Sequence, residues 1–379
     1  MVTPCHQRSW AALTAGLVMA GLAAAGCQTL QSFKGLVASK PTEAPVVEGP
    51  SESVEGITLF GQVGSGSGAP YVARPARSLQ QHTFASEGRD FDPDIDRTGR
   101  LMVFASTRHA PKPDIYVKSV TGSTVTQLTA EASSDVQPRF SPDGQKIAFA
   151  SDRTGNWDVW VMDSDGGNVT QVTSSHWQQI HPSWSPDGGK LAYCALAQSG
   201  APWELWVVDL SEPGTKKFIG YGLFPTWSPT EEKILFQRAR QRGSRWFSLW
   251  TIRLVNGEAS RPTEVASIAD GALVSPSWSP DGSQIAFCAL TPSEASSEQQ
   301  SDSTGGSDLW MIDADGRGKV CLTDGKGGSY SPAWSADGRL YFSSNRNGQE
   351  TVWSLLPIQG SALSRANGFL GGTQLGMSR

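Results

Sequence analysis

Residues 138–173 read PRFSPDGQKIAFASDRTGNWDVWVMDSDGGNVTQVT, and this stretch decides the fold. Near its start, Ser141-Pro-Asp-Gly144 is typical of a tight turn, because proline presets φ at the second position and glycine suits the exit. Short apolar runs follow at 147–149, 159–160 and 169–173. Each run is too short for a helix and turn residues separate them. The stretch therefore predicts a small antiparallel sheet.

The same pattern occurs six times along the chain. The prolines that open the copies are separated, by subtraction, by 45, 44, 43, 51 and 56 residues (Pro93, Pro138, Pro182, Pro225, Pro276, Pro332). Each copy later carries an aliphatic residue followed by an aromatic one, as in Val159-Trp160. One such sheet has two apolar faces, which are buried when several sheets stack radially. The repeats predict an all-β fold, a six-bladed β-propeller of four-stranded antiparallel blades over residues 78–360.

A propeller also needs a contact that joins its first and last blades. The segment Leu79-Gln-Gln-His-Thr83 aligns with the fourth strand at 125–129, but no first three strands precede it. The last copy ends near Ile358 without a fourth strand. We therefore predict that residues 78–84 pair with the third strand of blade six and close the ring. Ala362-Leu-Ser364 is the alternative occupant of that position.

The N-terminus is typical of an export signal. Residues 1–26 contain Arg8 and then an apolar run that is short for a membrane span. The run ends in Ala24-Ala-Gly-Cys27, which resembles the bacterial lipobox and predicts a lipoprotein signal peptide with acylation of Cys27. The following Gln28 resembles the default for sorting to the outer membrane. An ordinary cleaved signal with an unmodified cysteine is the alternative.

Two segments lack the hydrophobic periodicity of the repeats. Residues 27–77 are rich in Pro, Ser and Gly, including the run 64–68 that reads GSGSG. Such a composition buries too little apolar surface to offset the entropy of ordering, so it predicts a flexible tether. Residues 361–379 form a C-terminal tail.

The repeat resembles that of TolB-type β-propellers. The resemblance rests on Pro-x-Trp/Phe-Ser-Pro-Asp-Gly, Ser151-Asp-Arg-Thr-Gly155 and Asp163-Ser-Asp-Gly166, and it covers residues 78–360. It implies a periplasmic propeller that binds other envelope proteins, such as a peptidoglycan-associated lipoprotein docked near the central opening. TolB itself carries an α/β domain before its propeller and is soluble, whereas this linker is short and polar. The resemblance, with Cys27, therefore implies a TolB-like lipoprotein anchored to the periplasmic face of the outer membrane.

Composition and motifs argue against several other functions. The 31 Lys and Arg against 36 Asp and Glu give a net charge of −5, so we expect no nucleic-acid partner. A Gly-x-Ser-x-Gly nucleophile elbow and a phosphate-binding loop are absent from the sequence. His176 and His181 have no cysteine nearby, so no metal site is predicted. We expect no cofactor, no catalytic residues, and membrane contact only through the lipid anchor.

One group of residues departs from the packing pattern of its neighbours. These residues immediately precede the six repeated prolines, where one blade leads into the inner strand of the next (Asp92, Gln137, His181, Phe224, Ser275, Ser331). Because partners of TolB-like propellers approach such a ring, we predict that these residues bind the partner of a non-enzymatic scaffold. Solvated loop residues are the alternative interpretation. The runner-up function is a carbohydrate-active or small-molecule enzyme with a channel site, and only Asp92 and His181 of the ring support it.

Overall fold

The computed structural model describes residues 77–196, 202–212, 214–239, 247–268, 271–290 and 307–357. All regular elements in these ranges are β-strands. Blades one to three are four-stranded antiparallel sheets whose strands follow in chain order from the axis outward. Their strands are β2 (Asp90–Ile95), β3 (Leu101–Ser106), β4 (Asp114–Ser119) and β5 (Val125–Gln127); β6 (Asp135–Phe140), β7 (Lys146–Ser151), β8 (Asp158–Asp163) and β9 (Thr170–Gln171); and β10 (Gln178–Trp184), β11 (Lys190–Leu196), β12 (Glu204–Asp209) and β13 (Lys216–Tyr221).

Blades four to six follow the same plan with two variations. In blade four the outer position is shared by two short strands that both pair with the third, and one parallel pair, Phe247 with Ala272, joins this blade to the next. In blade six the outer strand comes from the beginning of the propeller. The strands are β14 (Leu223–Trp227), β15 (Lys233–Ala239), β16 (Phe247–Val255), β17 (Glu258–Ala259) and β18 (Thr263–Ala266); β19 (Ala272–Trp278), β20 (Gln284–Leu290), β21 (Ser307–Asp313) and β22 (Val320–Cys321); and β23 (Ser329–Trp334), β24 (Leu340–Ser344), β25 (Thr351–Leu356) and β1 (Arg77–Gln81).

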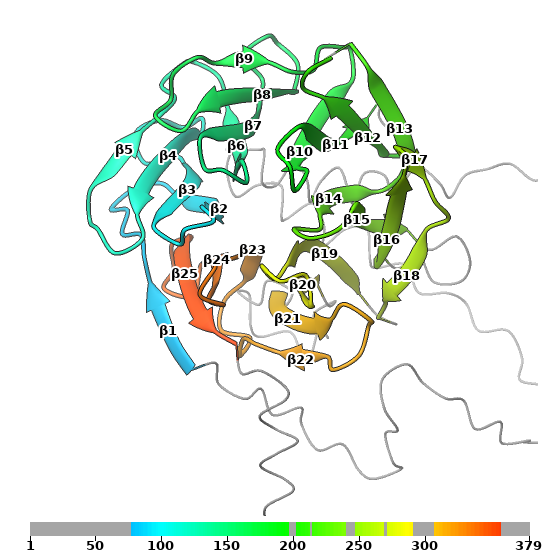
Figure 1. Cartoon of the computed structure of the whole chain (residues 1–379). Helices are drawn as coiled ribbons and strands as arrows, with labels where there is room; N and C mark the ends of the chain where they lie inside the picture. Colours follow the sequence, from blue (N-terminus) through cyan, green and yellow to red (C-terminus); the bar gives the residue numbers. More distant parts are fainter. Residues whose placement is uncertain are drawn as a thin grey trace, which may run out of the picture. The chain divides into compact units, whose positions relative to one another are not determined.

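The six innermost strands form a complete circle. Each contacts the innermost strand of both neighbouring blades, in the order β2, β6, β10, β14, β19, β23 and back to β2. Figure 1 shows the six sheets arranged around a common axis. The predicted fold class, an all-β propeller of antiparallel sheets, is confirmed, and the circle of six inner strands is consistent with the predicted six blades.

Apolar side chains fill the space between neighbouring blades. One cluster joins blades two and three through Ala148, Val161, Leu191 and Tyr193, and another joins blades five and six. Each blade places one aromatic ring of its second strand fully out of solvent, and each such ring stabilises the fold by roughly 1.5–3 kcal/mol. Trp184 also forms a directional contact between blades, because its indole N–H donates a hydrogen bond of 3.0 Å to a main-chain carbonyl of blade two.

The ring is closed by β1, as the sequence predicts. β1 pairs antiparallel with β25, and Gln81 lies opposite Trp353. The next residue, His82, is buried, and its Nε2 lies 2.8 Å from the Ser354 hydroxyl of β25. Residues 362–364, the alternative closing segment, lie outside the described residues.

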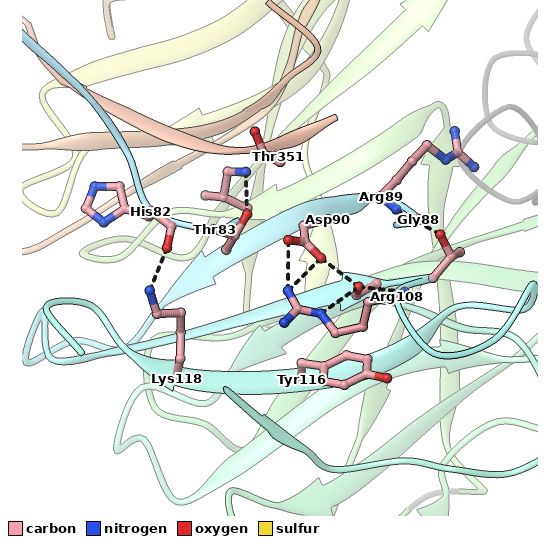
Figure 2. A network of polar contacts seen from close by, with 12 residues as sticks. His82, Thr83, Gly88, Arg89, Asp90, Arg108, Tyr116, Lys118 and Thr351 are labelled. Carbon is pink, nitrogen blue, oxygen red and sulfur yellow. Dashed lines mark hydrogen bonds and ion pairs between the residues drawn. The ribbon is translucent and has the colours of Figure 1, made fainter. Parts of the chain in front are cut away.

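Two cations stabilise blade one: the buried Lys118 links it to the segment after the closing strand, and the half-buried Arg108 acts within the blade. Figure 2 shows Lys118 of β4 reaching the main-chain carbonyl of His82, to which it donates a hydrogen bond of 2.6 Å. Figure 2 also shows Arg108, which donates two hydrogen bonds of 2.8 Å to Asp90, a carboxylate without solvent exposure. The Arg108 guanidinium lies 5.3 Å from the ring centroid of Tyr116. Charge pairing and cation–π contact together compensate for burying this cation.

The predicted signal peptide, Cys27 and the tether to residue 76 lie outside the described residues, as does the predicted tail at 361–379. These segments therefore stay predictions. Within the described ranges, no helix is long and apolar enough to cross a membrane.

Candidate functional site

The six candidate residues share one backbone conformation. Their φ angles lie between 49° and 57°, in the left-handed region (Asp92, Gln137, His181, Phe224, Ser275, Ser331). Among the described residues, nine non-glycine residues have positive φ, and six of them are these. An L-residue in this region costs roughly 1–2 kcal/mol, and such strain gathers at functional sites. We call these six residues the axial ring.

A β-bulge in each innermost strand produces this conformation. In blade one, Asp92 and Pro93 together oppose a single residue of β3, Phe104. The same two-to-one register shift recurs in the other five blades, because proline cannot donate a ladder hydrogen bond. The residue opposite each bulge is one of the fully buried aromatics (Phe104, Phe149, Tyr193, Phe236, Phe287, Phe342). Each axial ring residue therefore lies opposite a fully buried aromatic residue of its own blade.

Five of the six side chains make contacts across blade boundaries. The Ser331 hydroxyl donates to Asp92 Oδ1 at 2.6 Å, which links blades six and one. The His181 main-chain N–H donates to Gln137 Oε1 at 2.8 Å, and the two Nε2 atoms of these residues lie 3.3 Å apart. The His181 and Phe224 ring centroids are 4.3 Å apart. The structure thus brings the predicted residues together in two groups, and Ser275 belongs to neither.

Packing around the axis shifts the titration of both ionisable ring residues. Desolvation, together with the smaller effect of the charge of Arg139, lowers the pKa of His181 to about 3. His181 is therefore neutral at physiological pH, and with the Gln137 amide donating to its Nε2, its own proton lies on Nδ1. Desolvation raises the pKa of Asp92, although the Ser331 hydrogen bond and Arg139 oppose this shift.

The sequence interpretation missed two charged residues beside the ring. Asp94 and Arg139 directly follow the bulge prolines of blades one and two. Asp94 Oδ2 accepts the main-chain N–H of Phe140 in the next blade at 2.8 Å, and burial raises the pKa of Asp94 to about 6. The sequence contains a pattern that could have identified these two residues. The position after the proline is charged only in blades one and two and uncharged in the other four (Ser183, Thr226, Ser277, Ala333).

A third missed residue, Glu350, precedes β25. Burial raises the pKa of Glu350 to about 7, the cation of Arg89 lowers it, and the carboxylate of Asp92 raises it. The Arg89 Nη1 atom lies 3.6 Å from Glu350 Oε2. Carboxylates therefore gather where blades six and one meet, whereas the neutral His181 and Phe224 occupy blades three and four. The ring thus has an acidic side and an uncharged, partly apolar side, which would complement a ligand that carries both a cationic and an apolar group.

The described residues offer little support for the channel-site enzyme. Asp92 and His181, the two ring residues on which that alternative depends, contact different neighbours. In the part of the chain that the structure describes, no group of three His, Cys, Asp or Glu residues is arranged to hold a metal ion.

A ring of short antiparallel sheets around a common axis defines a β-propeller. The family model described as the TolB β-propeller domain matches residues 71–245 and 156–291, which together span more than half of the chain. The chain therefore belongs to the TolB β-propeller family. It is also 38% identical over 89 residues to the uncharacterized protein Atu1656 of Agrobacterium fabrum. That match covers 23% of this chain and about a quarter, 26%, of the relative.

Solved structures show the same fold at low identity. A protein described as a TolB from Agrobacterium tumefaciens superposes with a TM-score of 0.55 and 16% identity, over 74% of this chain and 97% of that one. TolB from Acinetobacter baumannii gives 0.54 and 17%, over 70% and 65%. An oligogalacturonate lyase in complex with manganese gives 0.50 and 15%, over 76% and 96%. At these identities, the similarity supports the fold and not a shared activity.

Proposed function

We propose that this protein is a non-enzymatic TolB-like scaffold that binds a protein or a peptidoglycan-associated partner of the bacterial cell envelope. The observation that carries the proposal is the axial ring, six strained residues at equivalent positions of six blades. Strain that recurs at every inner strand, at residues of which five are half-buried and one is buried, is typical of a preorganised binding surface.

The ring also indicates what kind of segment it binds. Asp92 and Glu350 offer acceptors for a cationic or donor group, and Phe224 beside the neutral His181 offers an apolar contact. A partner segment that carries a basic residue and an apolar residue would complement both sides. A few central contacts of this kind supply most of the affinity in protein recognition.

A site-specific crosslink tests this proposal. Phe224 is replaced by the photoreactive p-benzoylphenylalanine in the full chain, expressed in the bacterial envelope, with the same replacement at Val255 as the control. Val255 is 60% exposed and lies outside the ring. We expect one adduct of defined mass from position 224 that weakens with Asp92→Asn or His181→Ala. An adduct formed equally from position 255, or unchanged by both ring substitutions, would remove the ring from the proposal.

The second part of the proposal is the location, a periplasmic protein anchored to the outer membrane by acylated Cys27. The lipobox-like residues Ala24-Ala-Gly-Cys27 support the anchor, and membership of the TolB family supports the periplasmic location. Cys27→Ser should abolish labelling with a radioactive fatty acid and release the protein into the soluble periplasm. Membrane retention of the Cys27→Ser variant would show that the anchor is wrong, whatever the ring binds.

A further inference from the structure

A second surface, remote from the axial ring, consists of four aromatic rings in continuous contact. Trp177 precedes β10, Trp206 lies in β12, and Phe218 and Tyr221 lie in β13, the outermost strand of blade three. Successive ring centroids are separated by 6.3, 5.7 and 5.2 Å, in edge-on arrangements. We call these four residues the aromatic stripe. Figure 1 shows β13 on the outer side of its blade.

The repeat itself does not require this stripe. Phe218 lies opposite Trp206 in the ladder, and the other five blades show what normally faces the aromatic of the third strand. Those blades carry no aromatic residue there (Gln127, Gln171, Glu264, Cys321, Gln81). Phe218 is nevertheless 41% exposed and Tyr221 47% exposed. Aromatic residues that are added to a repeat and left half in water indicate a binding surface.

Polar groups border the stripe. Trp206 donates its indole N–H to Glu204 Oε2 at 2.9 Å, which holds the carboxylate beside the rings. The Asn156 amide donates to the main-chain carbonyl of Trp177 at 2.6 Å and fixes the loop that carries this tryptophan. On the opposite side of β13, Lys217 forms an ion pair with Glu258 of blade four. The stripe is therefore a narrow apolar row between hydrogen-bonding groups.

Size and charge select the class of ligand. A fully buried aromatic side chain covers about 150–250 Å², so the exposed fractions of these four rings leave about 400 Å² at most. A stable protein interface covers roughly 800 Å² on each side, about twice that area, so the four rings alone match a smaller ligand. The Glu204 carboxylate lies beside the rings, whereas the charge of Glu258 is compensated by its ion pair with Lys217. A sugar has an apolar C–H face edged by hydroxyl groups, and that shape and polarity complement a bordered row of rings.

We propose that the aromatic stripe binds an oligosaccharide, whose sugar faces stack on Phe218 and Tyr221 and whose hydroxyls bond to Glu204. This binding is independent of the axial ring and of the anchor at Cys27. It gives the propeller a second ligand of a different chemical class.

Titration of the full chain with N-acetylchitotetraose or cellotetraose, followed by tryptophan fluorescence and calorimetry, tests the proposal. Phe218→Gln installs the residue that blades one and two carry at this position, so we expect it to fold. It should weaken binding by about tenfold, the loss expected from removing one stacking ring. Phe84→Gln, which alters a 75% exposed aromatic outside the stripe, should not change affinity.

Two results would overturn the proposal. One is the absence of saturable binding of either tetrasaccharide at millimolar concentration, and the other is equal affinity of the wild type and Phe218→Gln. Binding to anionic phospholipid vesicles that depends on Phe218 without any sugar binding would assign the stripe to lipid instead. Because Phe218→Gln leaves the axial ring intact, the crosslink from position 224 reports separately on the proposed scaffold function.

Discussion

Glycine substitution in the axial ring gives a direct measure of its backbone strain. Ser275 and Ser277 are half-buried serines of β19, and neither hydroxyl has a hydrogen-bond partner among the described residues. Ser275 has a φ of 49°, whereas Ser277 is not among the residues with positive φ. Glycine relieves a left-handed residue of roughly 1–2 kcal/mol, but it costs about 0.5–1 kcal/mol of backbone entropy at either position. Because that entropic cost is common to both, the difference between the two variants isolates the strain.

Ser275→Gly should therefore raise the free energy of unfolding by about 0.5–1 kcal/mol, and Ser277→Gly should lower it by about 0.5–1 kcal/mol. Urea titrations followed by tryptophan fluorescence measure both, provided that the m-value stays constant. If Ser275→Gly were as destabilising as Ser277→Gly, the bulge would carry no conformational strain, and the main argument for the axial ring as a preorganised site would fail.

Three further perturbations test the charges of the fold. Arg153→Met leaves the fully buried Asp135 without its cation and should lower the free energy of unfolding by about 3–5 kcal/mol in urea melts, whereas Lys146→Met, which removes an exposed pair, should cost less than about 1 kcal/mol. Burial raises the pKa of Glu350 from 4.5 to about 7, so the folded chain keeps a proton that the unfolded chain loses. Wild-type stability should therefore fall, by up to about 3 kcal/mol, as the pH rises from about 4.5 to 7, and Glu350→Gln should remove that slope in urea melts at several pH values. Burial lowers the pKa of His82 from 6.5, so the unfolded chain takes up a proton first as the pH drops, and stability should fall below about pH 6.5. Thermal melts of the wild type and His82→Gln at several pH values test this, and an unchanged dependence of stability on pH in the variant would refute the assignment.

Most of the fold was predictable because its signals are local. Each turn such as Ser141-Pro-Asp-Gly144 presets its own backbone, and the spacing of the prolines counts the blades. The closing strand was also predictable, since Leu79–Thr83 repeats the pattern of a fourth strand that lacks its own sheet. The aromatic stripe was not predicted, because in the sequence Trp177 and Phe218 are indistinguishable from tryptophans and phenylalanines that pack between blades. Only the ladder position opposite Trp206 shows that Phe218 is an addition to the repeat.

The sequence by itself determined the number of sheets, their order and the positions of the ring residues, since turn geometry and strand length depend on neighbours within a few residues. Tertiary structure alone decided what those positions do. The left-handed backbone of Asp92 arises from a register shift against another strand. The contact of His181 with Gln137 and the effect of Asp92 on Glu350 join residues more than forty positions apart. Such contacts depend on how neighbouring blades pack against one another at the axis, and local sequence patterns do not specify that packing.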